Sequence, residues 1–124
     1  MLTTGATVLT GLLSAALIVM GVRAFTAPRS AAGFGIPGTP GDDPAFWPWL
    51  RVKGLREIAC GGFAFVLIFA GTPALLAAYV VILAAIPLGD AVLVLRSGGP
   101  KAIAYGVHAA TAAVMLVTGV GLMV

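Results

Sequence analysis

The sequence predicts an all-α fold: a bundle of four transmembrane helices that forms a single integral membrane domain, 1–124. Composition is the first reason, because 60% of the residues are hydrophobic and only 9% are charged. Soluble domains carry roughly 25% charged residues, and one small core cannot bury this much apolar surface. Spacing is the second reason, because the chain contains four apolar runs, each near the ~20 residues that a spanning helix needs.

The first helix is predicted over about 2–25, an uncharged apolar run that ends near Arg23. No basic residue precedes this run, so it does not have the pattern of a usual secretory signal. Residues 26–50 are rich in proline and glycine, which disfavours a regular helix. We predict a long loop that returns to the membrane surface at Trp47 and Trp49, since tryptophan favours the headgroup level.

The other three helices follow one another closely and are predicted over 51–71, 73–96 and 100–124. Pro73 is a favourable first-turn residue for the third helix, and Pro87 inside it predicts a kink. The breaks between these helices, GTPA and RSGGPK, are short. Short connections make neighbouring helices antiparallel.

All charged side chains fall on one side of this predicted bundle. The seven basic residues lie there and none lies on the other side: Arg23, Arg29, Arg51, Lys53, Arg56, Arg96 and Lys101. The positive-inside rule then predicts a protein of the cell inner (plasma) membrane with a cytoplasmic long loop. Both termini are predicted to lie outside.

Ionisable residues of three predicted helices reach a similar depth. Asp90 lies six residues in from Arg96, about 9 Å along a helix, and His108 lies seven residues in from Lys101. Ionisable groups inside a membrane usually face the bundle interior and mark functional sites. We therefore predict Asp90 and His108 as a catalytic acid–base pair.

Four further residues are predicted to bind a ligand around that pair: Lys53, Arg56, Glu57 and Tyr105. Lys53 and Glu57 are spaced to pair on one helix face. Arg56 points about 100° away from Glu57 and is free to reach Asp90. Tyr105 lies three residues before His108, on the same face of an α-helix.

A purely structural interpretation of the cluster stands beside this one with equal weight. Pairs such as Arg56 with Asp90 would lock three helices in register. Breaking a buried pair of this kind typically costs about 3–5 kcal/mol. His108 taken alone is more often a hydrogen-bonded packing residue than a base.

Several classes of site are not expected. With one histidine and one cysteine, Cys60, the chain offers no zinc or haem ligand set, and we predict no metal and no cofactor. No phosphate-binding loop or serine elbow is present. The basic residues are too few for a nucleic-acid surface and are better explained as contacts to lipid headgroups.

One pattern carries a resemblance over nearly the whole chain. RVKGLREIACGG at 51–62 is preceded by GFGIP, and is followed by IPLGD at 86–90 and by a histidine in the last helix. This resembles a bacterial family of small four-helix integral membrane proteins of unknown function. A family pattern K-G-x-R-[DE], with a late aspartate in helix 3, falls on Lys53, Gly54, Arg56, Glu57 and Asp90. The overall shape also resembles the DoxX-like group, and the resemblance implies no established activity.

Three functions stay open at this point. The first is a cytoplasm-facing polar pocket that binds a small lipophilic molecule or converts it by acid–base chemistry. The second is an accessory or structural subunit of a membrane complex, favoured by the small size and by helix faces rich in small residues. The third is a small proton-coupled transporter that acts as a homo-oligomer. The lipid bilayer is the expected partner in every case, and no nucleic acid is expected.

Overall fold

The computed structural model describes all residues, 1–124, and the chain is helical with no β-strand. Its α-helices are α1 (Leu2–Thr26), α2 (Trp47–Ala70), α3 (Pro73–Leu83), α4 (Ala85–Arg96), α5 (Lys101–Ile103) and α6 (Ala110–Gly121). A 3-10 helix, η1 (Pro28–Phe34), follows α1, and a π-helix, η2 (Ala104–Ala109), joins α5 to α6.

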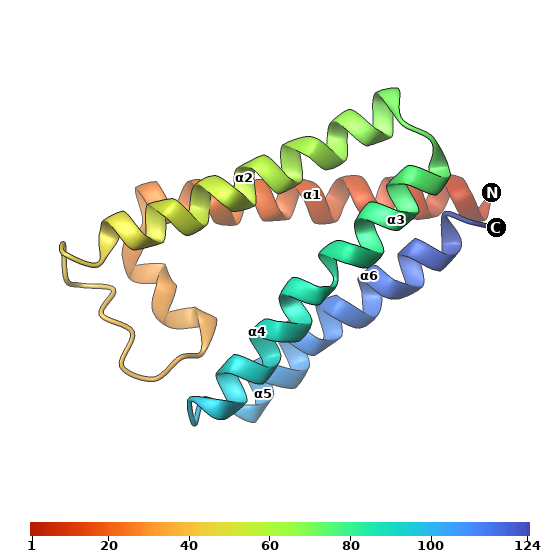
Figure 1. Cartoon of the computed structure of the whole chain (residues 1–124). Coiled ribbons are helices and arrows are strands. Elements are labelled where there is room, and N and C mark those ends of the chain that lie inside the picture. The colour runs from red at the N-terminus through yellow and green to blue at the C-terminus, as the bar shows by residue number, and fades with distance from the viewer.

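The helices form two antiparallel pairs (Figure 1). α1 packs along α2, and the run from α3 to α4 packs along the run from α5 to α6. Both termini lie at one end of the molecule, where the pairs meet (Figure 1). The pairs diverge toward the other end, where η1 and the segment that follows it lie (Figure 1).

Glycines allow α1 and α2 to approach closely. A Cβ on Gly54 would lie 2.5 Å from the carbonyl oxygen of Gly21, and one on Gly61 would lie 2.7 Å from that of Ser14. The two contact positions are seven residues apart on each helix. In a membrane, small residues at an interface bring backbones together and so strengthen van der Waals packing.

The third predicted helix is divided into α3 and α4. Local chemistry specifies where α3 starts. The Thr72 hydroxyl accepts a hydrogen bond from the Leu75 amide at 3.2 Å, and Pro73 occupies the first turn. The helix is interrupted at Ala84. Pro87 has no N–H to donate to the carbonyl of Leu83, so the interruption lies where the proline predicts it.

The last predicted helix contains a wider turn. Lys101–Gly121 is one continuous helical run, but its stretch Ala104–Ala109 is a π-helix that buries Ala104 and His108. π-Turns within α-helices are rare and occur frequently at functional sites. Nothing in the sequence analysis predicts this one.

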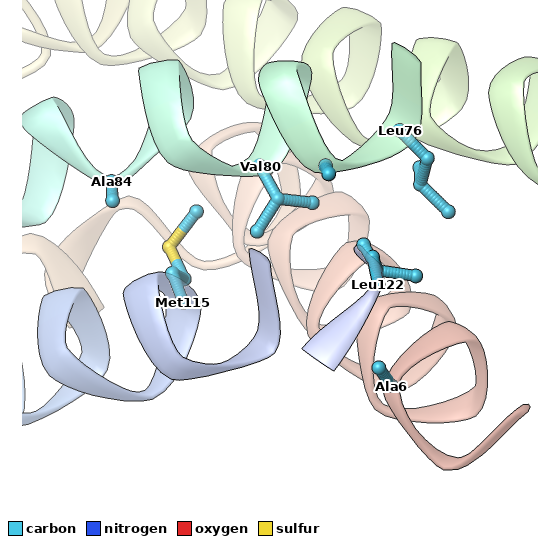
Figure 2. Close-up of a cluster of buried hydrophobic side chains, with 7 residues drawn as sticks. Ala6, Leu76, Val80, Ala84, Met115 and Leu122 are labelled. Atoms are coloured by element: carbon cyan, nitrogen blue, oxygen red, sulfur yellow. The ribbon is translucent and has the colours of Figure 1, made fainter. Parts of the chain in front are cut away.

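A small apolar core lies at the end of the molecule that carries the termini (Figure 2). Its members come from α1, α3, the Ala84 break and the last helix: Ala6, Leu76, Ala77, Val80, Ala84, Met115 and Leu122. Three of the seven are alanines, which suits close packing between helices whose outer faces meet lipid.

Three helical runs are long and apolar enough to cross a membrane: Leu2–Thr26, Pro73–Arg96 and Lys101–Gly121. The chain therefore has the helices of a membrane protein. α2 is not among the three, because Arg51, Lys53, Arg56 and Glu57 occupy its first half. α2 also begins at Trp47, earlier than predicted, and the predicted loop 26–50 contains the helix η1.

Candidate functional site

His108 is the centre of the polar cluster and is buried, with 7% of its surface exposed. Its Nε2 lies 2.8 Å from the carbonyl oxygen of Phe34, in η1. A carbonyl only accepts hydrogen bonds, so Nε2 carries the proton and donates it. The two rings are also in contact, with centroids 4.5 Å apart and their planes tilted by 51°. His108 thus joins the last helix to η1, a contact between residues 74 positions apart.

Asp90 faces the other nitrogen of the same ring. Its Oδ2 lies 4.0 Å from Nδ1 of His108, and its side chain is 25% exposed. This distance is within the range of an ion pair but too long for a hydrogen bond. The predicted juxtaposition of Asp90 and His108 is therefore present as a loose contact between α4 and η2.

Lys53 and Glu57 form the ion pair within α2 that their spacing predicts. The ammonium group of Lys53 also lies 5.3 Å from the centroid of the Phe34 ring, a cation–π contact. Phe34 is therefore in contact with both Lys53 and His108. Sequence reasoning missed Phe34, although the glycines beside it in GFG were visible.

The predicted pairing of Arg56 with Asp90 is absent. Arg56 is exposed and takes part in no ion pair, whereas Asp90 faces His108. The reason is angular: Gly54 faces α1, and a residue two positions further along a helix lies about 200° away, on the outer face.

Tyr105 does not share a face with His108. Its side chain is exposed, with 58% of the residue's surface accessible, while His108 is buried. Both residues lie in the π-helix η2, where each turn holds more residues than an α-turn. The prediction assumed α-helical spacing, and the wider turn separates the two side chains.

A cavity of about 800 Å³ lies between the diverging helix pairs, closed on one side by η1. Its polar lining includes Arg23, Lys53, Glu57 and His108. Much of its wall is apolar and comes from α1, α2, α4 and η2: Ala16, Val19, Met20, Leu50, Leu93 and Val107. Asp90, Arg56 and Tyr105 do not line it.

Gly35 attaches η1 to the second helix pair. Its φ is +104°, a conformation that favours glycine. A Cβ there would lie 2.8 Å from Ile103 and 3.2 Å from Val94, so the backbone of Gly35 packs directly on α4 and α5. The structure contains no group of three or more side chains placed to hold a metal ion.

The fold and the site together define a class: a small helical membrane protein with a cavity of mixed polarity at one end. A family model described as "Domain of unknown function (DUF4267)" matches residues 14–122. The chain belongs to this family, which agrees with the predicted membership of a family of unknown function. No curated protein and no solved structure matches the chain.

Proposed function

We propose that this protein binds a small lipophilic molecule in the cavity between α1, η1, α2 and η2. The observation that carries the proposal is the cavity itself, about 800 Å³, with apolar walls and a few converging polar side chains. Small-molecule sites are typically concave, mostly apolar and roughly 300–1,000 Å³ in volume. A mostly apolar cavity near the charged residues of an apolar bundle suits a molecule that partitions into lipid.

The geometry favours binding over acid–base conversion. Nε2 of His108 is engaged by the Phe34 carbonyl, and Nδ1 faces Asp90 rather than the cavity. A general base must lie within hydrogen-bond reach of the proton it takes. His108 would therefore have to release Phe34 before it could act on a bound molecule.

We also propose four membrane crossings, in the inner membrane of a bacterium. α1 and the run α3–α4 point in the same direction (Figure 1), and their first turns share one apolar core. A chain that crosses the membrane twice in one direction has to return in between, and only α2 connects the two runs. Because the basic residues lie at the end opposite the termini, the positive-inside rule favours a cytoplasmic segment 27–46. The DoxX-like likeness remains a prediction about architecture.

Two adjacent alanines of α1 provide the test of ligand binding. Ala16 lines the cavity, whereas Ala15 is exposed and does not. The protein and its variants Ala16→Trp and Ala15→Trp would be purified from their own membranes and weighed by native mass spectrometry. We expect a co-purifying small mass on the wild type and on Ala15→Trp, and its loss from Ala16→Trp. Wild-type protein without any such mass, or equal retention by both variants, would contradict the proposal.

An accessory role in a membrane complex is the second candidate. Gly62, Gly89 and Gly106 have no neighbour within 4 Å of a Cβ position, so they offer open places where another helix could approach. Recovery of the protein from mild detergent only as a single stable monomer would count against this candidate.

A further inference from the structure

The charges of the side chains that line the cavity do not sum to zero. The charged side chains are Arg23, Lys53 and Glu57, and Lys53 is paired with Glu57. Arg23 takes part in no ion pair or side-chain hydrogen bond. Among these three side chains, one positive charge therefore has no counter-ion in the lining, at Arg23.

Arg23 lies at one end of an apolar stripe that α1 contributes to the cavity wall. Arg23 lies in the last turn of α1, at the polar end of the molecule. Met20, Val19 and Ala16 line the same cavity three, four and seven residues earlier. Residues at these intervals form one stripe along a helix, so the apolar wall extends about 10 Å inward from the charge.

We propose that the occupant is a single-chain amphiphile with a carboxylate head, which pairs with Arg23 while its chain lies along the α1 stripe. This inference rests on the proposed function. A guanidinium presents paired N–H donors that match a carboxylate. One carboxylate also balances the single charge of Arg23, whereas a phosphate monoester carries about −1.5 to −2 at neutral pH.

The test compares two probes of equal chain length, oleate and oleyl alcohol. Full-length protein in neutral detergent is titrated with each, and the fraction that carries one adduct is measured by native mass spectrometry. Arg23→Gln is the test variant. Arg96→Gln is the control, because Arg96 also lies in the last turn of a helix but does not line the cavity and has no ion pair.

We expect the wild type and Arg96→Gln to bind oleate more tightly than oleyl alcohol. Arg23→Gln should bind oleate about tenfold more weakly and oleyl alcohol as the wild type does, since it loses a charge-assisted hydrogen bond. Equal weakening by both substitutions, or no wild-type preference for oleate, would overturn the inference but leave the cavity as a lipophilic site. Competition by acetate as effective as that by oleate would overturn the role of the chain. Failure of both probes to bind the wild type would count against the proposed function as well.

Discussion

His108 illustrates how one side chain can hold together distant parts of this chain. Its ring contacts the ring of Phe34, donates a hydrogen bond to the carbonyl of Phe34 and faces Asp90, so three helical segments meet at one ring. We expect His108→Ala to lower the free energy of unfolding by about 1–3 kcal/mol, because the Phe34 carbonyl loses its donor in a part-buried site. His108→Gln, which can still donate an N–H at similar reach, should recover part of that loss. Thermal unfolding in detergent checks both, and an alanine variant as stable as the wild type would contradict the assigned hydrogen bond.

At the same scale, sequence reasoning succeeds where the partners lie on one regular helix. The Lys53–Glu57 pair follows from a spacing of four residues, and it is present. The predicted pairing of Arg56 with Asp90 fails because a sequence does not specify which face of α2 meets α1. Tyr105 is misplaced for another reason, since the prediction assumed α-helical turns where the chain forms a π-helix.

The pair of glycines at 61 and 62 tests how α1 and α2 pack. A Cβ on Gly61 would lie 2.6 Å from Cγ1 of Ile18 and 2.7 Å from the Ser14 carbonyl, whereas one on Gly62 would meet nothing within 4 Å. We expect Gly61→Ala to destabilise the protein by about 1–3 kcal/mol through overpacking. Gly62→Ala should be neutral or stabilising by up to about 1 kcal/mol, since alanine favours a helix over glycine. Thermal unfolding of the two variants side by side measures the difference in stability. Equal effects would mean that Gly61 does not set how closely α1 and α2 approach.

Element boundaries were largely predictable because apolar runs, prolines and a capping threonine define them. The start of α3 at Pro73 and the interruption before Pro87 both follow from local chemistry. η1 was not predicted, because a segment rich in proline and glycine is expected to be irregular. Its position depends on tertiary contacts made by Phe34 and Gly35.

At the scale of the whole molecule, the cavity results from the divergence of two helix pairs that share a core only at one end (Figures 1 and 2). At the shared end the side chains of the apolar core fill the space. At the other end η1 fills part of it and leaves about 800 Å³. The sequence indicated which ionisable residues lie at that end. A polar pocket was among the predicted functions, but the sequence could not indicate which residues line the cavity. That depends on how far the two helix pairs diverge, which is set by the glycine contacts and the core.

The same arrangement predicts how the chain is oriented across the membrane. Three exposed positions report on it in a Cys60→Ser background: Thr4→Cys at the start of α1, Ala45→Cys before α2, and Ala74→Cys at the start of α3. An impermeant maleimide should label the first and third in intact cells, because α1 and α3 begin at the end of the molecule that carries no charged side chain. The second should be labelled only after the membrane is opened, since the basic residues favour the cytoplasmic side. If Ala74→Cys were protected while Thr4→Cys reacted, α2 would not cross the membrane and the four-helix topology would fail. If Ala45→Cys reacted in intact cells while the other two were protected, the four crossings would stand but with the opposite orientation.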